Sequence, residues 1–326
     1  MSSAALLQVQ QMQLGLADGT ALVDGVSWSL QPGQTLAVVG ESGSGKSLSA
    51  MALMGLLPAA VQWQGGQAWL QGQPLHELST AQWRQLQGRR IGMVFQEPMT
   101  SLNPVMRVGE QVVEVLRCHL ALPYRQARER AIELLGSIQI PQPKQRFAHY
   151  PHQLSGGQRQ RVMIAMALAC DPVLLLADEP TTALDVTVQA DILQLIAEQQ
   201  KRRGLGVVLI THDLGVVAQV ADHVVVMYGG QVMEQGPAAQ LLSAPGHPYT
   251  QGLLRARPSA HRPRSERLQE IPGIVAAPSR QRAGCPFAPR CASALPICAQ
   301  QQPPAFELEA QRSSSCWLHH SGGGHG

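Results

Sequence analysis

The residues from Gly40 to Ser47 have types and a spacing that can bind phosphate groups. They match the pattern of a glycine, four free positions, Gly-Lys, and then Ser or Thr. A glycine-rich turn of this kind directs successive backbone N–H groups, and the helix N-terminus that follows, toward one anion. The Lys46 ammonium would bind the β- and γ-phosphates, and the Ser47 hydroxyl would be a ligand for Mg²⁺. The motif therefore predicts that the chain binds a nucleoside triphosphate.

The sequence on both sides of this motif fits a loop between a strand and a helix. The apolar run at 35–39 predicts a buried strand, and residues 48–57 predict a helix that ends before Pro58. A chance glycine-rich turn would not be expected to have both neighbours. The residues expected to line the phosphate site are Gly40, Glu41, Ser42, Gly43, Ser44, Gly45, Lys46 and Ser47.

An apolar run that begins at residue 173 ends in two adjacent carboxylates, Asp178 and Glu179. A buried strand that delivers carboxylates at its C-terminal edge is how parallel sheets present Mg²⁺-binding and catalytic groups. We expect Asp178 to hold the metal, directly or through water, and Glu179 to polarise the attacking water. A plain buried strand would account for the leucines alone, but the phosphate-binding loop in the same chain favours the catalytic interpretation.

The pentapeptide at 154–158 precedes an expected helix at 159–169. Its serine and two glycines could open a second helix N-terminus that binds phosphate. The pentapeptide is identical to the signature of the ATP-binding cassette (ABC) ATPases, and the chain resembles that family. In the family the signature closes over the ATP held by a partner's phosphate loop, so the resemblance implies a dimer with two shared sites. The signature residues are Leu154, Ser155, Gly156, Gly157 and Gln158.

Three further residues match family elements in the order that the family has. Gln96 follows an expected strand at 91–95 and matches the loop glutamine that senses Mg²⁺ and the attacking water. Asp185, in Ala183-Leu184-Asp185, matches the loop that crosses the dimer interface. His212 follows an expected strand at 207–210 and matches the switch histidine that contacts the γ-phosphate. The resemblance thus implies catalytic roles for Glu179, His212 and Gln96, and Mg²⁺ binding by Ser47, Gln96 and Asp178.

One position departs from the family pattern. Members usually stack the adenine ring on an aromatic residue near the N-terminus, and the matching position here is about Leu16. No aromatic residue occurs between Met1 and Val26. The sequence therefore leaves open what contacts adenine, an aliphatic side chain or a group from elsewhere, and how tightly ATP is distinguished from other triphosphates.

The composition favours a cytosolic protein with a sizeable core. The chain has 326 residues, 44% of them hydrophobic, enough for one large domain with a small one or for two ordinary domains. The net charge is +3, and the basic residues form no stripe with interleaved aromatics, which argues against nucleic-acid binding. No run approaches the roughly 18 apolar residues of a membrane span, and no signal-peptide pattern opens the sequence.

The resemblance implies an α/β fold of the ABC nucleotide-binding type, built on a P-loop NTPase core sheet. Short alternating strands such as 26–30, with turns expected at Gly65-Gly66 and Gln71-Gly72, predict an antiparallel β subdomain. Apolar residues spaced by three and four predict helices over about residues 97–154, which the resemblance implies are the inserted helical subdomain of the family. Strands and helices alternate again from 155 to about 235, with a helix at 187–203 that ends at Gly204. The predicted cassette therefore spans 1–236.

About ninety residues follow the cassette, and they make the resemblance specific to one branch of the family. The sequence His247-Pro248-Tyr249-Thr250, followed by Leu253-Leu254, and the segment from Glu97 to Pro104 resemble the ATPases of the peptide and nickel importers. The resemblance implies that the chain powers the import of di- or oligopeptides, with nickel or another metal chelate as the alternative cargo. We expect a C-terminal extension over 237–320 and a disordered glycine-rich tail over 321–326.

Six cysteines in a cytosolic chain favour ligands or free thiols over disulfides. Four lie in the extension, with five, six and seventeen residues between them, which is not the paired spacing of common zinc sites. In the importer group the matching cysteines can ligate a [4Fe–4S] cluster, which the resemblance favours; Zn²⁺ and free thiols are the alternatives. Cys118 and Cys170 lie in apolar helical patterns and are expected to be core thiols. The four cysteines of the extension are Cys285, Cys291, Cys298 and Cys316.

The resemblance also implies partners, because a chain without a membrane span cannot form a channel. We expect two transmembrane permease subunits, an extracytoplasmic substrate-binding protein, and a second ATPase that is a paralogue or another copy. The protein would then be peripheral on the cytoplasmic face of the bacterial inner membrane, with ATP and Mg²⁺ as cofactors. The competing class is a non-transport cassette protein, which usually has two cassettes or a long coiled coil; an efflux cassette is disfavoured by the extension.

Overall fold

The computed structural model describes residues 5–96, 101–182, 184–256, 270–275, 283–309 and 311–320. The chain divides into two compact units, and each is described by itself. The first unit comprises Met1–Leu6, Gln31–Gln34 and Glu77–Leu209. The second unit comprises Leu7–Leu30, Thr35–His76 and Ile210–Gly326.

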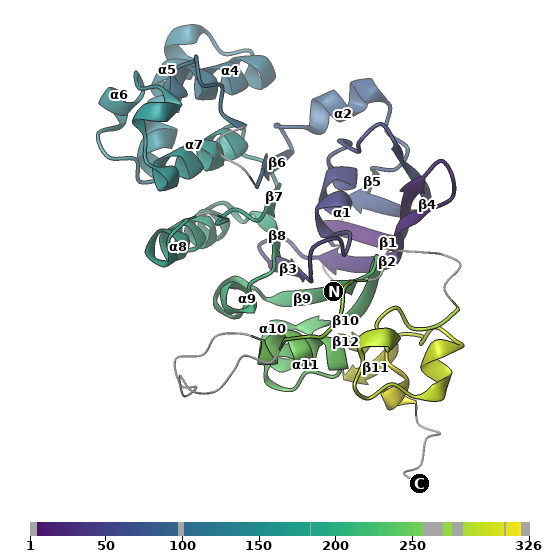
Figure 1. Cartoon of the computed structure of the whole chain (residues 1–326). Coiled ribbons are helices and arrows are strands. Elements are labelled where there is room, and N and C mark those ends of the chain that lie inside the picture. Colours follow the sequence, from purple (N-terminus) through teal and green to yellow (C-terminus); the bar gives the residue numbers. More distant parts are fainter. Residues whose placement is uncertain are drawn as a thin grey trace. The chain divides into compact units, whose positions relative to one another are not determined.

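The second unit contains an antiparallel sheet in the order β2-β1-β4-β5 (Figure 1). Apolar residues alternate with polar ones along β1, so that Leu7, Val9, Met12 and Leu14 are buried. This period of two gives the sheet one apolar face, as the sequence predicts. The strands are β1 (Leu7–Leu16), β2 (Ala21–Leu30), β4 (Val61–Leu70) and β5 (Gln73–Pro74).

One of the two turns expected in this sheet is confirmed and the other is wrong. Gln71 and Gly72 join β4 to β5, and both have positive φ, at 48° and 79°. Gly65 and Gly66 instead lie inside β4, where the pairing with β1 shifts register between Gln10 and Gln13. Gly66 has φ 73°, and a Cβ atom there would clash with the Gln11 carbonyl group. The Gly-Gly pair therefore forms a bulge that keeps the two strands paired.

The second unit also contains strands in the order β11-β12-β10-β9-β3. β3 (Thr35–Val39) is buried throughout and pairs in parallel with β9 (His223–Tyr228), with Val39 opposite Val226. The other pairs are antiparallel. The remaining strands are β10 (Gln231–Pro237), β11 (Phe306–Glu309) and β12 (Arg312–Ser314), and the helices are α1 (Lys46–Leu53), α9 (Leu214–Val220), α10 (Ala238–Ser243) and α11 (Pro248–Arg255).

One hydrophobic core joins β3 and β9 to residues of the C-terminal extension. Val39 and Val226 belong to the same buried cluster as Tyr249, Phe287 and Cys298. The rings of Tyr228, Tyr249 and Phe287 pack edge to face or tilted, with centroids 4.8 to 5.3 Å apart. The extension thereby obtains the apolar contacts that its own sequence lacks.

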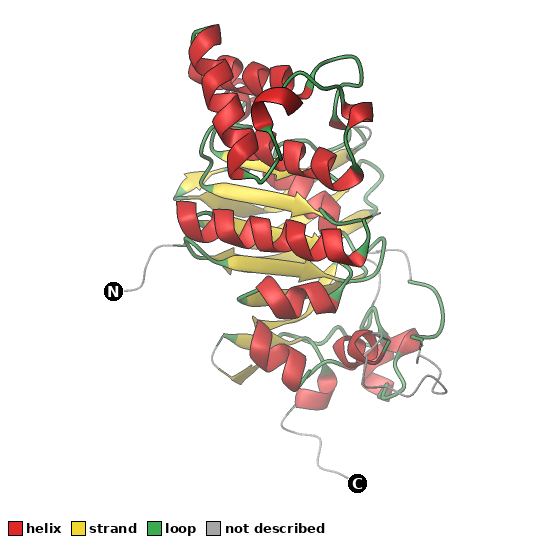
Figure 2. Ribbon diagram, turned by 90° about the vertical axis from the view of Figure 1, so that its left-hand side faces the viewer, coloured by secondary structure: helices red, strands yellow, loops and turns green. Residues whose placement is uncertain are grey.

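The first unit contains strands in the order β8-β7-β6. β6 (Ile91–Val94) and β7 (Leu174–Asp178) are parallel and fully buried, with Ile91 opposite Leu174. β8 (Gly206–Thr211) starts in this unit and its last two residues belong to the second. The helices, shown with the strands in Figure 2, are α2 (Thr80–Leu86), α4 (Val108–Leu120), α5 (Tyr124–Ser137), α6 (Pro143–Arg146), α7 (Gly156–Leu168) and α8 (Val186–Arg203).

Helices α4, α5 and α6 lie between β6 and β7 in the sequence, in the region where helices are expected, and are grouped with α7 (Figure 1). On α4 the buried side chains Val108, Val112 and Leu116 recur every four residues and form its core-facing stripe. Cys118 is exposed, because it lies two residues, or about 200°, past Leu116 on this helix. Its assignment to the core is therefore wrong, whereas Cys170 is buried as expected.

Other expected elements are present with changed boundaries. The helix expected at 48–57 is α1, which ends at Leu53, before Gly55 with φ 65°. The helix expected at 187–203 is α8, and Gly204 ends it with φ 63°. Among the residues described here, no helix is long and apolar enough to cross a membrane. Residues 97–100, Ala183 and the tail 321–326 lie outside the described residues.

Two glycines of the first unit predict opposite changes in stability. A Cβ atom at Gly92 in β6 would clash with the Ala167 carbonyl group, so Gly92→Ala should lower the free energy of unfolding by about 2–4 kcal/mol. A Cβ atom at Gly136 in α5 would have Pro143 Cγ as its nearest neighbour, at 3.6 Å, so it would fit. Gly136→Ala should therefore raise the free energy of unfolding by up to about 1 kcal/mol. Urea unfolding measures both, and equal effects would contradict the packing of β6.

Candidate nucleotide-binding and hydrolysis site

The predicted phosphate-binding loop connects β3 to α1 in the second unit. Two of its glycines are required by the backbone. Gly40 has φ 153°, and a Cβ atom there would clash with the Met227 carbonyl oxygen of β9. Gly45 has φ 95° and caps α1, and a Cβ atom there would lie only 2.9 Å from Val23 Cγ2. The loop can take this path only because both residues lack a side chain.

The Lys46 ammonium group holds the loop closed. It donates hydrogen bonds to the carbonyl oxygens of Gly40 at 2.8 Å and Glu41 at 2.9 Å, and to Ser44 Oγ at 3.3 Å. The side chain is buried, and these acceptors offset the cost of removing its charge from water. Ser47 follows in the first turn of α1, half-buried. The predicted cation and the predicted Mg²⁺ ligand thus start the same helix.

The predicted carboxylates lie at the end of β7 in the first unit. Asp178 is the last residue of the strand and is buried. Glu179 has φ 45°, a backbone conformation that a non-glycine residue adopts only when its surroundings impose it. Its Oε2 atom accepts hydrogen bonds from Thr182 Oγ1 at 2.8 Å and from Gln96 Nε2 at 3.2 Å. The structure therefore brings together Gln96 and Glu179, which the sequence places 83 positions apart.

The signature motif opens α7 as the sequence predicts. Ser155 and Gln158 form a capping box, in which Ser155 Oγ accepts from the Gln158 N–H at 3.3 Å. Leu154 is buried, and a Cβ atom at Gly157 would lie 2.6 Å from Val188 Cγ1. Asp185 caps α8 by accepting the Val188 N–H at 3.0 Å, so this predicted interface residue also has a local structural role.

Two further predicted residues lie in the second unit. His212 is exposed and follows β8, just before Asp213 caps α9. Leu16 is half-buried at the end of β1, and its carbonyl oxygen accepts from Gln64 Nε2 at 2.9 Å. Two parts of the predicted motifs lie outside the described residues. They are residues 97–100 of the segment from Glu97 to Pro104, and Ala183 of the predicted interface loop.

Sequence reasoning missed two residues that contact the phosphate-binding loop. The Tyr249 hydroxyl accepts a hydrogen bond from the Glu41 N–H at 2.8 Å, and Arg290 Nη1 donates to Glu41 Oε2 at 2.8 Å. Burial raises the pKa of the Tyr249 phenol, which therefore stays neutral. These residues follow the loop by 208 and 249 positions, and no local pattern signals the contact.

The four cysteines of the extension line one small cavity of about 10 Å³, room for about one water molecule. Burial raises the pKa of the thiols of Cys285 and Cys291, and raises that of Cys316 to about 11. These thiols are therefore neutral at pH 7. Among the residues that the structure describes, no group of three or more His, Cys, Asp or Glu side chains could hold a metal ion. The cavity gathers the predicted ligands but does not itself support a metal.

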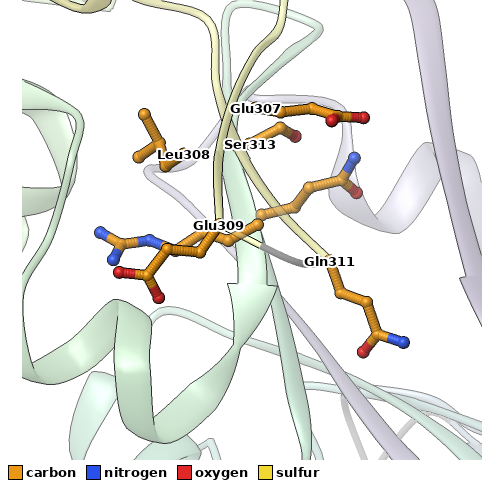
Figure 3. Close-up of a pocket in the computed structure, with 7 residues that line it drawn as sticks. Glu307, Leu308, Glu309, Gln311 and Ser313 are labelled. Carbon is orange, nitrogen blue, oxygen red and sulfur yellow. The ribbon is translucent and has the colours of Figure 1, made fainter.

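A separate cavity of about 460 Å³ lies at the β11–β12 hairpin (Figure 3). Glu307 and Leu308 point to opposite sides of β11, as neighbours on a strand do. Arg312, which also lines the cavity, forms a buried ion pair with Glu234 at 3.2 Å and so fixes the hairpin to β10. None of the predicted nucleotide-site residues lines this cavity.

Comparisons with known proteins identify the class. The family described as "ABC transporter" matches residues 23–182. A dimeric ATP-binding cassette in a post-hydrolysis state, bound to ADP and phosphate, is 27% identical and covers 71% of this chain and 98% of its own, with a TM-score of 0.63. A cassette of Clostridium perfringens that is part of an ABC transporter complex is 29% identical over 74% of this chain and 91% of its own, with a TM-score of 0.66. The fold is that of the ABC ATPases.

Closer relatives define the branch of that class. The family described as "Oligopeptide/dipeptide transporter, C-terminal region" matches residues 233–298. The "Probable peptide ABC transporter ATP-binding protein" of Sinorhizobium fredii is 45% identical, over 96% of this chain and 94% of its own. The dipeptide transport ATP-binding protein DppD of Escherichia coli is 46% identical, over 96% of both chains. The chain belongs to the ATP-binding subunits of the peptide ABC transporters, which confirms the predicted resemblance.

The contacts of Glu179 predict a specific defect in hydrolysis. Glu179→Gln should lower the ATPase rate by about 100-fold to 1000-fold, because an amide cannot accept a proton from water, and should leave ATP binding intact. Thr182→Val, which removes one hydrogen bond to Glu179, should cause a smaller loss. Steady-state phosphate release and equilibrium ATP binding measure the two effects. A Glu179→Gln protein with a near-normal rate would remove Glu179 from this role.

Proposed function

We propose that this protein is the ATP-hydrolysing subunit that powers import of di- or oligopeptides through a multi-subunit ABC transporter. The observation that carries the proposal is similarity along 96% of the chain to peptide-transporter ATP-binding proteins, together with the motifs for the phosphates, Mg²⁺ and the attacking water. The C-terminal match to oligopeptide and dipeptide transporters supports a peptide cargo over nickel.

The proposed reaction is transfer of the ATP γ-phosphoryl group to water, catalysed by positioning and charge stabilisation. The loop from Gly40 to Ser47 binds the phosphates, with the Lys46 ammonium near the β- and γ-phosphates. Ser47 and Asp178 would hold Mg²⁺, which would neutralise phosphate charge, and Gln96 would bind the metal and position the attacking water. Glu179 orients that water. The Gln96–Glu179 hydrogen bond supports this, because it aligns the two side chains assigned to one water molecule.

The proposed assembly contains two ATPases that share their sites. In it His212 contacts the γ-phosphate, the signature residues 154–158 close over ATP bound to the partner, and Asp185 lies at the interface. The capped N-terminus of α7 supports a phosphate-binding role for the signature, since its first N–H groups lack intrahelical partners. The second ATPase is a paralogue or another copy, and leucine at position 16 leaves the adenine contact to another group.

The proposed domains follow the sequence boundaries, with a cassette at 1–236 and an extension at 237–320. The partners are two transmembrane permease subunits and an extracytoplasmic substrate-binding protein. The protein is then peripheral on the cytoplasmic face of the bacterial inner membrane, where ATP is supplied. Co-purification with ribosomes or DNA, in place of membrane subunits, would instead favour the non-transport class.

Uptake by the complete transporter tests the proposed function. With permease and receptor subunits in vesicles loaded with ATP, the protein should drive uptake of a labelled dipeptide, and Lys46→Ala should lower that uptake at least about 100-fold. The variant should still assemble, because Lys46 belongs to no proposed subunit contact. Unchanged uptake by Lys46→Ala, or no ATP hydrolysis with all subunits present, would overturn the proposal; ATP-driven uptake of nickel alone would favour the other cargo.

We also infer a metal group at Cys285, Cys291, Cys298 and Cys316, a [4Fe–4S] cluster in preference to Zn²⁺. What supports this is that four thiols from distant positions line one cavity. As they lie in the structure they do not form a metal-holding arrangement, so binding would require them to move closer and to release their protons. No step of ATP hydrolysis depends on this inference.

Metal analysis of the purified protein tests the thiol assignment. Protein purified without oxygen should absorb near 400 nm and contain about four iron atoms per chain. Cys298→Ala should lose the iron, and Cys118→Ala, at the exposed cysteine of α4, should retain it. Stoichiometric zinc without iron, or absence of both metals, would contradict the cluster.

A further inference from the structure

The second residue of the phosphate-binding loop, Glu41, is an acid where the motif leaves the residue type free. A carboxylate beside a triphosphate repels it, and the repulsion is strong where water does not screen it. The Glu41 side chain is 26% exposed, so it is only partly screened. The proposed binding role assigns the Lys46 charge to the β- and γ-phosphates, so a second positive charge beside Glu41 would offset this repulsion.

Arg290 provides that charge from the C-terminal extension. Its Nη1 atom donates to Glu41 Oε2 at 2.8 Å, and its side chain is only 6% exposed. Both residues belong to the second unit, so the pair lies within one compact unit. An ion pair of this geometry is shielded from solvent on the arginine side and is stronger than an exposed pair.

Several contacts fix the Arg290 guanidinium in place. It donates to the carbonyl oxygens of Pro272 at 2.8 Å and Ile271 at 3.0 Å, and to the Tyr228 hydroxyl at 3.3 Å. Its central carbon also lies over the Tyr228 ring, 5.6 Å from the ring centre. The residue ends a short 3₁₀ turn, Ala288–Arg290, that directly follows the core residue Phe287. The charge therefore cannot follow Glu41 if the carboxylate turns toward a phosphate.

Tyr249 fixes the backbone of the same loop residue. Its hydroxyl accepts the Glu41 N–H at 2.8 Å, and its fully buried ring packs against the rings of Tyr228 and Phe287. The extension thus holds Glu41 at two points, the main chain and the carboxylate. A side chain held at both points has one orientation relative to the loop.

We propose that Arg290 is a positioning residue for ATP binding, which neutralises Glu41 and holds its carboxylate away from the phosphates. The inference rests on the proposed ATP-binding role of the loop and adds a role for the extension in it. Arg290 acts through Glu41 and does not itself touch the nucleotide. The extension would thereby set the affinity of the loop for ATP.

Neutralising Arg290, Glu41 or both tests this inference. In the full chain, Arg290→Gln should raise the Kd for Mg·ATP about fivefold, and Glu41→Gln should lower it about threefold, because each leaves the other charge unopposed. The double variant should return to within about twofold of the unaltered protein. For Arg290→Gln the kcat for ATP hydrolysis should stay within about twofold while the KM for ATP rises, because Arg290 acts on binding. Isothermal titration and phosphate release measure these values.

Control variants distinguish the effect of the lost Arg290 charge on the Kd from a defect in folding. Arg125→Gln, at an exposed arginine of α5, makes the same change in net charge and should leave the Kd unchanged. Arg290→Lys keeps the positive charge, so its Kd for Mg·ATP should stay within about twofold of the unaltered protein's, even if its melting temperature falls. A merely structural role would predict that Glu41→Gln does not rescue Arg290→Gln. If Arg290→Gln does not fold, the lowered Kd of Glu41→Gln alone decides the question, and an unchanged or raised Kd overturns the inference.

The inference and the proposed function fail in different ways. Unchanged Kd values in Arg290→Gln and Glu41→Gln, in a chain that binds and hydrolyses ATP, overturn only the role of Arg290. Absence of ATP binding by the unaltered chain overturns the proposed function and the inference with it.

Discussion

The buried ammonium group of Lys46 constrains the structure around the phosphate-binding loop. A buried cation is unfavourable unless its donors are satisfied, and here three loop oxygens accept them. For those oxygens to converge, the loop must curl tightly beyond the end of β3. This curl brings Gly40 against the carbonyl group of Met227, where no side chain fits. The loop conformation and the parallel pairing of β3 with β9 therefore depend on one another.

The same constraint reaches the C-terminal extension through Glu41. Glu41 follows Gly40 in the loop, and Tyr249 and Arg290 hold Glu41 by its N–H and its carboxylate. Both depend on an aromatic core shared with β9, where Tyr228 contacts the rings of Tyr249 and Phe287. The extension has few apolar residues of its own, so its order depends on packing against the strands that position the loop.

The phosphate-binding loop and the predicted catalytic residue Glu179 are held in place by different kinds of contact. In the second unit, the loop that would bind phosphate is held by hydrogen bonds to main-chain oxygens and by glycine conformations. In the first unit, Glu179 occupies a left-handed conformation and is held by side-chain bonds from Gln96 and Thr182. A strained acid held by two donors is oriented before any ligand arrives, which is the property that positioning of a water molecule requires.

Local patterns in the sequence determined the strand, loop and helix around Lys46, the acids at the end of β7 and the Ser155 cap, because each depends on neighbours within a few residues. The same reasoning misassigned Gly65-Gly66, since a bulge and a turn share their glycines and only pairing with β1 distinguishes them. It also misassigned Cys118, because periodicity does not fix which face of a helix is covered. Tertiary structure alone brought Arg290 to Glu41 and four thiols to one cavity. Such contacts join residues far apart in the chain, and they exist only once the strands have paired and the core between them has closed.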